Sequence, residues 1–332
     1  MKSNNLDTLR LILASLVVLE HTNNLFHLAQ GDPGRFDFFL LNLSGVAVSA
    51  FFVISGMLTY ASFERDPDVV RFYLRRFFRV FPAYWTVLAL QIVAFTILAT
   101  ALIDWDALPR YVIANVLTAN FLQPSFIEGV SAINGSLWTI KIEASYYVIL
   151  PFLFPLLARK PTLLILSLLS LIWAVALPNE TLAKQLPGKL YLFGLGVMLA
   201  RYASFITPRL SLIALLSLPL GLVALFQLEH ILLVGEIAQA TVSVAVVVAF
   251  MRHWFARETV DISYTLYLVH YPILVALTHF VLPGQSFITV LVTGLVLSLA
   301  CAVALSYLLE RPALAIGRRL VSRHRKATGN TG

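Results

Sequence analysis

Two ionisable side chains in the first apolar segment have the types and spacing to do chemistry together. Arg10 and His21 lie eleven residues apart, so on a helix they are about 20° apart around the axis and about 16 Å apart along it. An imidazole can act as a general base near neutral pH, and a guanidinium can hold a phosphate. The pair predicts an arginine that binds the phosphate end of a long substrate and a histidine that reacts at the other end. A capping arginine and a hydrogen-bonded core histidine fit the same spacing.

A second group of basic side chains lies between residues 65 and 79, where all five basic residues are arginines. Arg76 and Arg79 would share one face of a helix because they are three residues apart. Arginine is favoured over lysine where a phosphate accepts two parallel hydrogen bonds. This composition favours phosphate binding by Arg76 and Arg79, with anchoring at the membrane interface as the alternative.

Further candidates are small, acidic or aromatic residues inside apolar segments. Ser55 and Gly56 would let a ligand or another helix approach closely, and tight helix packing is the alternative. Glu143 needs a partner from another segment, because Lys141, two residues earlier, cannot face it on a helix. The side chains that could line a sugar-binding surface are Trp138, Tyr146, Tyr264, Tyr267 and His270. The alternatives are an aromatic belt at the membrane surface and, for the histidine, a structural hydrogen bond.

Helices in a lipid bilayer must position these residues, because the chain is too apolar for a water-soluble domain. Of its 332 residues, 59% are hydrophobic and 12% are charged, about half the charged fraction of a soluble protein. Since about 20 apolar residues cross a bilayer as one helix, we predict an all-α polytopic membrane protein, a bundle of about ten transmembrane helices. The expected spans are 8–28, 38–62, 80–103, 136–157, 161–178, 188–203, 209–228, 231–250, 260–282 and 286–309. A long loop is expected at 104–135, in which residues 111–122 form a half-helix or lie at the membrane interface.

The basic residues predict the orientation of these spans. If both termini are cytoplasmic, every inner segment is basic, and together these segments carry 19 of the 24 lysines and arginines, as the positive-inside rule requires. The inner segments are then 1–10, 63–79, 158–160, 201–209, 251–259 and 310–332. Topology thus explains the net charge of +7, and no nucleic acid is expected as a partner. We expect one domain over residues 1–332, with a disordered basic tail at 320–332.

Taken together, these motifs resemble the acyltransferase 3 family of membrane O-acyltransferases, which includes bacterial O-antigen and exopolysaccharide O-acetyltransferases. In chain order, the matching positions are Arg10 and, after ten residues, His21; FFVISG, ending in Ser55 and Gly56; Arg76, Arg79 and Pro82; LWTIKIEASYY with Glu143; Ser263, Tyr264, Tyr267, Leu268, His270 and Pro272; and Glu310, Arg311 and Pro312. Each motif is weak alone, but the ordered set from residue 10 to residue 312 is specific. Lys141 and Ala144 depart from the residues that many members have around the glutamate.

The resemblance implies an O-acyltransferase in the inner membrane of a bacterium, with acyl-CoA, usually acetyl-CoA, as donor substrate and no bound cofactor or metal. The acceptor would be a hydroxyl of a cell-surface or lipid-linked carbohydrate, with a polysaccharide biosynthesis complex as a further partner. His21 would take the proton from that hydroxyl, and Glu143 or another carboxylate would orient His21. Direct transfer and transfer through an acyl-enzyme both fit this arrangement. The donor would be bound by Arg10, Arg76, Arg79, Ser55 and Gly56, and the acceptor by Trp138, Tyr146, Tyr264, Tyr267 and His270.

Other functions fit the same residues. A proton-coupled transporter would use His21, Glu143 and His270 as a proton path and would move its substrate without CoA. A scaffold subunit of a polysaccharide assembly complex would behave normally after the substitution His21→Ala. The sequence does not separate an acetyl donor from another acyl donor such as succinyl-CoA, because the depth of a pocket cannot be inferred from helix spacing.

Overall fold

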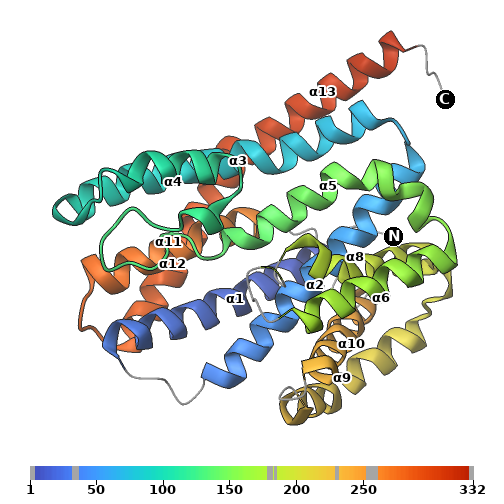
Figure 1. The fold of residues 1–332 in the computed structure, drawn as a ribbon, viewed down its shortest axis with the longest axis horizontal. Helices are drawn as coiled ribbons and strands as arrows, with labels where there is room; N and C mark the ends of the chain where they lie inside the picture. The colour runs from blue at the N-terminus through green and yellow to red at the C-terminus, as the bar shows by residue number, and fades with distance from the viewer. Residues whose placement is uncertain are drawn as a thin grey trace. The chain divides into compact units, whose positions relative to one another are not determined.

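The computed structural model describes residues 4–31, 37–177, 182, 185–228, 232–251 and 261–328, and its regular structure within these ranges is helical (Figure 1). The pairing of Ile103 with Ile127 is an isolated β-bridge. The helices are α1 (Asn4–Gln30), α2 (Asp37–Arg65), α3 (Val69–Leu98), α4 (Ala107–Val116), α5 (Leu137–Leu157), α6 (Lys160–Ala176), α8 (Leu186–Arg201), α9 (Pro208–Leu228), α10 (Leu232–Met251), α11 (Ser263–Ala276), α12 (Phe287–Leu305) and α13 (Arg311–Ala327). Short 3₁₀ helices are η1 (Thr100–Leu102), η2 (Asn120–Leu122) and η3 (Ala203–Phe205), and π-helices are η4 (Leu277–Val281) and η5 (Ser306–Glu310).

Within the described ranges, eight helices are long and apolar enough to cross a membrane, so the predicted polytopic all-α fold is confirmed. They are α1, α2, α3, α5, α9, α10, α11 continued by η4, and α12 continued into α13. The predicted spans 161–178 and 188–203 correspond to α6 and α8, which have 17 and 16 residues. Both are shorter than the roughly 20 residues that a span needs.

The structure departs from the prediction at the start of α3 and in the C-terminal tail. Helix α3 begins at Val69 rather than at residue 80, because the Asp68 side chain accepts a hydrogen bond from the Arg71 backbone N–H at 2.8 Å and caps the helix. The loop 104–135 contains the ten-residue helix α4. The tail expected to be disordered from residue 320 is helical to Ala327. The predicted inner segment 251–259 lies outside the described residues except for Met251, as do residues 1–3 and 329–332.

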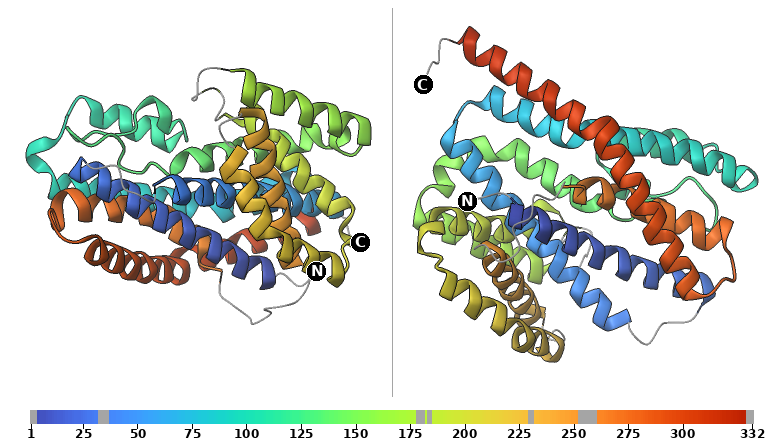
Figure 2. Two further views of the ribbon diagram at one scale, coloured as in Figure 1. Left: turned by 90° about the horizontal axis from the view of Figure 1, so that it is seen from below. Right: turned by 180° about the vertical axis from the view of Figure 1, so that it is seen from behind.

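The chain divides into two compact units, each built from three segments. Unit 1 comprises Met1–Val17, Phe38–Pro67 and Ile142–Asp261. In it α6 packs against α8, and α9 packs against α10 (Figure 2). A Cβ on Gly56 would lie 2.3 Å from the Phe193 carbonyl oxygen, so α2 and α8 touch backbone to backbone. The prediction that residues 1–332 form one domain stays a prediction.

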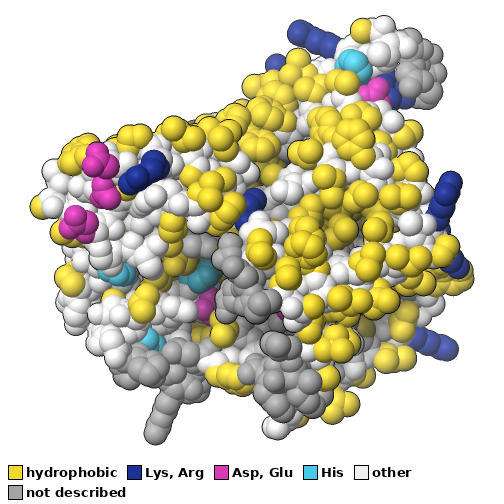
Figure 3. Space-filling view, viewed as in Figure 1, with side chains coloured by type: hydrophobic (Ala, Val, Ile, Leu, Met, Phe, Trp, Pro, Cys, Tyr) yellow, Lys and Arg dark blue, Asp and Glu magenta, His cyan; other side chains and the backbone are white. Residues whose placement is uncertain are grey.

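Unit 2 comprises Val18–Asp37, Asp68–Lys141 and Ile262–Gly332. Helix α13 runs beside α3, and α11 packs against α12 and α3 (Figures 1 and 2). A buried cluster that includes Leu25, Phe95, Tyr111 and Leu274 joins α1, α3, α4 and α11. The face drawn in Figure 3 is largely hydrophobic, as expected of helices that contact lipid.

Candidate active site

A pair of histidines in unit 2 joins α1 to α11. His21 Nδ1 lies 2.9 Å from His270 Nε2, and the two ring planes differ by 18°. His270 is fully buried, whereas 21% of the His21 side chain is exposed. The structure thus brings together the predicted catalytic histidine and a residue that we assigned to the acceptor site.

For a neutral histidine pair, the hydrogen bonds favour one assignment of the ring protons. His270 Nδ1 lies 3.2 Å from the Leu266 carbonyl oxygen. Since a carbonyl oxygen can only accept, His270 Nδ1 carries the hydrogen and Nε2 accepts. His21 Nδ1 is then the donor to His270. The remaining nitrogen, His21 Nε2, keeps a lone pair that can take up a proton.

Two further side chains contact His21 and were not predicted. Glu20 Oε2 lies 3.4 Å from His21 Nε2, and Glu20 is only 5% exposed. The Tyr271 ring meets His21 edge to face, with a centroid distance of 4.9 Å. A carboxylate inside an apolar helix is itself a signal of function, so Glu20 was detectable from the sequence. The sequence carries no comparable signal for Tyr271.

Hydrogen bonds from the start of α5 and the preceding loop hold α11 in place near the histidines. Asn134 Nδ2 donates to the Leu268 carbonyl oxygen at 3.0 Å. Thr139 Oγ1 donates to Tyr267 Oη at 2.9 Å, and the Tyr267 ring lies 5.6 Å from the His270 ring. Tyr267 therefore supports His270 through buried contacts.

The segment before α5 is also tied to α3 and α4. Asn134 Nδ2 donates to Gln91 Oε1 at 3.1 Å, and Gln91 Nε2 donates to Tyr111 Oη at 2.6 Å. Burial raises the pKa of the Tyr111 phenol far above its usual value, so this group stays neutral. The loop predicted at 104–135 is thus part of the scaffold around α11.

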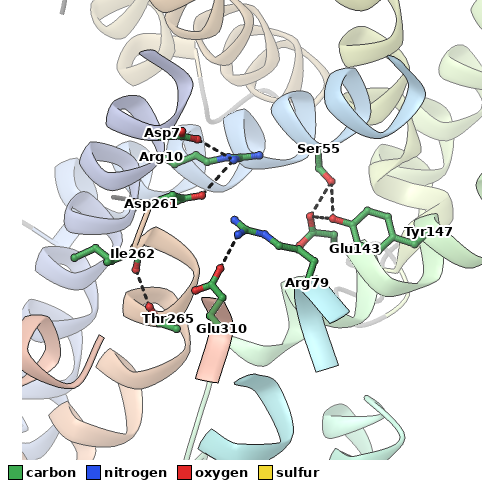
Figure 4. Close-up of polar contacts among 10 residues, drawn as sticks. All are labelled: Asp7, Arg10, Ser55, Arg79, Glu143, Tyr147, Asp261, Ile262, Thr265 and Glu310. Atoms are coloured by element: carbon green, nitrogen blue, oxygen red, sulfur yellow. Dashed lines mark hydrogen bonds and ion pairs between the residues drawn. The ribbon is translucent and has the colours of Figure 1, made fainter. Parts of the chain in front are cut away.

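Glu143 belongs to a separate cluster in unit 1, drawn in Figure 4. Ser55 Oγ donates to Glu143 Oε1 at 2.8 Å, and the Tyr147 hydroxyl donates to the same oxygen. Ser55 and Tyr147 thus share one carboxylate oxygen of Glu143. Tyr147 lies four residues after Glu143, on the same helix face. This spacing could have identified Tyr147 as a hydrogen-bond partner of Glu143. The predicted role of Glu143 in orienting His21 stays a prediction.

Arg10, also in unit 1, is held between two carboxylates (Figure 4). Its Nη1 lies 3.4 Å from Asp7 Oδ1 and 3.5 Å from Asp261 Oδ2. Both contacts within the described part of the chain use the same nitrogen, so Nε and Nη2 remain available as donors. Sequence reasoning missed Asp261 because it lies 251 residues away.

Arg76 and Arg79, the two arginines of α3 that we predicted to bind phosphate, have different surroundings. Arg79 Nη1 forms an ion pair of 2.6 Å with Glu310 Oε1 (Figure 4), and Glu310 is 2% exposed. The Arg79 guanidinium also lies 5.9 Å from the Tyr264 ring. Arg76 lies over the Phe72 ring at 5.4 Å. Arg79 and Tyr264 therefore take part in packing between α3, α11 and η5, and their predicted ligand contacts stay predictions.

The other predicted residues are placed as follows. Gly56 forms the backbone contact between α2 and α8 described above, which favours the helix-packing interpretation. Tyr146 has no exposed surface, and its ring stacks on Phe193 with a centroid distance of 4.0 Å. Trp138 is half-buried on α5. Their predicted contacts with donor or acceptor stay predictions.

Comparison of the sequence with known proteins identifies a matching protein family and two relatives. The family model described as acyltransferase domain matches residues 3–307. Over 171 residues the chain is 32% identical to nodulation protein 10 of Rhizobium leguminosarum bv. viciae, an alignment that covers 47% of this chain and 45% of that protein. Over 156 residues it is 29% identical to an O-acetyl transferase of Shigella phage Sf6, covering 45% of each. The matches thus span about half the length of these curated relatives, and no solved structure matches the chain.

Proposed function

Since this chain belongs to the acyltransferase domain family, we propose that it is a membrane O-acyltransferase that moves an acetyl group from acetyl-CoA to a hydroxyl of a cell-surface or lipid-linked carbohydrate. The phage relative is named an O-acetyl transferase, which supports an acetyl group as the transferred group and an oxygen as its acceptor. The observation that carries the proposal is the hydrogen-bonded chain from Leu266 through His270 to His21. We place the protein in a bacterial inner membrane with both termini cytoplasmic, on the basis of its basic inner segments.

His21 Nε2 acts as the general base in this proposal. It takes the proton from the acceptor hydroxyl as the oxygen attacks the thioester carbonyl carbon. The ester C–O bond forms, the C–S bond breaks, and the CoA thiolate leaves with the proton that His21 returns. His270 is a positioning residue, because its hydrogen bond fixes the His21 tautomer in which Nε2 is unprotonated.

Glu20 stabilises the charge that develops during this transfer. When His21 Nε2 is protonated, the ring becomes an imidazolium whose positive charge lies beside the Glu20 carboxylate, 3.4 Å away. A fixed carboxylate in a site with little water favours the charged transition state more than it does the neutral ground state. The buried position of Glu20 is consistent with this role.

Arg10 binds the phosphate end of the donor. Helix α1 is continuous from Asn4 to Gln30, so Arg10 and His21 are about 16 Å apart along one helix face, a length that suits an extended pantetheine arm. Asp7 and Asp261 hold the guanidinium through Nη1 and leave the other nitrogens for phosphate oxygens. That Arg76 binds a phosphate of the donor stays a prediction.

The substitution Arg10→Ala is expected to raise the KM for acetyl-CoA about tenfold or more, because a hydrogen bond to a charged group contributes about 1.5–3 kcal/mol. The kcat at saturating donor should change by less than threefold. Steady-state kinetics on the reconstituted protein measures both. Arg318→Ala, on the exposed face of α13, is the control and should match wild type. An unchanged KM in Arg10→Ala would contradict the phosphate assignment.

The substitution Gly135→Ala is expected to lower kcat about tenfold through Tyr271. A Cβ at Gly135 would lie 2.6 Å from Tyr271 Cζ, so a shift is required, and we expect the tyrosine ring to turn away and lose its edge contact with His21. Aromatic pairs contribute about 0.5–1.5 kcal/mol, and each 1.36 kcal/mol is tenfold in rate. In a Tyr271→Ala background the same substitution should have no further effect. Additive losses in the double variant would show that Gly135 acts by another route.

Mass spectrometry of surface glycans tests the proposed reaction in cells. Cells that express the chain should carry a base-labile acetyl ester that matched cells lacking it do not carry. A succinyl ester would correct the donor and retain the reaction. Glycans without any additional ester, in cells that insert the protein normally, would contradict the proposal.

A further inference from the structure

Helix α13 extends the last membrane span well beyond the length that a bilayer requires. Residues Phe287–Ala327 form one helical run of 41 residues, which is about 61 Å long at 1.5 Å per residue. The hydrocarbon core of a bilayer is about 30 Å thick. Because the exposed side chains of α12 are apolar, α12 occupies this core and α13 continues past it.

One face of α13 packs on the first three turns of α3, and the helices run side by side in Figures 1 and 2. Ala313 and Gly317 are buried on this face. A Cβ on Gly317 would lie 2.8 Å from Phe78 Cβ, so the two helices are in close contact here. Further along, His324 Nε2 lies 3.6 Å from Asp68 Oδ2, beside the N-terminus of α3.

A stripe of basic side chains follows an exposed flank of α13. Arg319, Arg323 and Lys326 are exposed and lie four and three residues apart, so they share one face of the helix. Within the described part of the chain, none of the three pairs with a carboxylate. Ile316 lies on the same flank and is 48% exposed. Along this flank the helix thus changes from apolar to basic, as a helix does where acyl chains give way to headgroups.

The neighbouring surface of α3 indicates that the basic stripe lies at the membrane surface. Val70, Phe77 and Trp85 are exposed and recur at intervals of seven and eight residues, so they share one face of α3. The Phe77 and Trp85 rings meet edge to face with a centroid distance of 5.7 Å. This apolar face, which lipid would cover, reaches the first turn of α3. That turn lies beside His324, at the depth where α13 exposes its basic residues.

We propose that the stripe of Arg319, Arg323 and Lys326 binds the phosphate groups of anionic phospholipids in the inner leaflet, where the positive-inside rule places α13. A guanidinium can donate two parallel hydrogen bonds to a phosphate. Each lysine or arginine near an anionic membrane surface strengthens binding about fivefold. The occupant is a lipid because Ile316 and the apolar face of α3 contact acyl chains beside the same phosphates. The inference does not depend on the proposed acyl transfer.

The test counts the lipids that stay bound to the full-length protein. Wild type and variants are placed in nanodiscs with equal amounts of phosphatidylglycerol and phosphatidylcholine, and native mass spectrometry gives the ratio of the two lipids retained. Arg319→Gln/Arg323→Gln removes two charges from the stripe. The matched control Arg110→Gln/Arg318→Gln also removes two exposed arginines, one on α4 and one about 100° around α13 from Arg319. Arg319→Lys/Arg323→Lys keeps both charges of the stripe.

Wild type is expected to retain about fivefold more phosphatidylglycerol than phosphatidylcholine, and Arg319→Gln/Arg323→Gln should lower this ratio about threefold or more. The matched control and the lysine variant should both stay close to the wild-type ratio. Equal retention of the two lipids by wild type, or an equal fall in both glutamine variants, would overturn the proposal. A raised KM for acetyl-CoA in Arg319→Gln/Arg323→Gln, with an unchanged lipid ratio, would also overturn it and assign the stripe to the donor.

Discussion

Replacing His21 with alanine is expected to lower kcat for acyl transfer by a factor of about 10²–10⁴, the usual contribution of a general base. The KM for acetyl-CoA should stay within twofold of wild type, because the contacts of Arg10 with Asp7 and Asp261 do not involve the imidazole. Steady-state kinetics on equal amounts of inserted protein measures this split. A loss that appears mainly in KM would instead indicate that His21 binds a substrate.

Two companion variants show whether the histidine pair acts as described. His270→Ala removes the acceptor of the His21 Nδ1 hydrogen, so we expect an intermediate loss, about tenfold in kcat. His324→Ala is the control, because this histidine lies on α13 beside Asp68 and takes no part in the proposed chemistry. If His270→Ala retains full kcat, the tautomer of His21 does not depend on His270.

Replacing Arg79 with methionine is expected to lower the free energy of unfolding by about 3 kcal/mol. The ion pair with Glu310 is 2.6 Å long, and Glu310 is 2% exposed, so the substitution leaves a buried carboxylate without its guanidinium. Removing one partner of a buried pair costs about 3–5 kcal/mol, whereas replacing both by apolar residues is often neutral. The double variant Arg79→Met/Glu310→Met should therefore recover most of the lost stability. Equilibrium unfolding in detergent micelles measures all three proteins.

The double variant also separates two roles of Arg79. If Arg79 binds a phosphate of the donor, the KM for acetyl-CoA stays raised about tenfold after stability is restored. A wild-type KM in the stable double variant assigns Arg79 to packing alone. Equal instability of the single and double variants would contradict the ion pair as the source of the effect.

The sequence was sufficient to predict the membrane-spanning helices, because the lipid bilayer requires each of them to have a minimum length and an apolar composition. It misplaced the start of α3, since Arg71, Arg75 and Arg76 lower the local hydropathy although Asp68 caps a helix there. The basic tail looked disordered by composition. Helix α13 continues the run from α12 and has basic residues in its last turn, where they favour the helix dipole.

The candidate site was predictable where its residues share a helix. Arg10 and His21 were identified together because their spacing places them on the same face of one helix. The contacts of Arg10 with Asp261 and of His21 with His270 span about 250 residues, and spacing along the chain contains no information about such pairs. Individual motifs suggested the roles of Glu143 and Tyr264, but only the fold shows that one contacts Ser55 and the other Arg79.

The most direct test of the central claim is the transfer of radiolabel from acetyl-CoA to a membrane glycan fraction by wild type and by His21→Ala, side by side, with insertion of both proteins verified. The proposed mechanism predicts label in the glycan with wild type and label close to background with His21→Ala. Equal labelling by the two proteins would contradict His21 as the base.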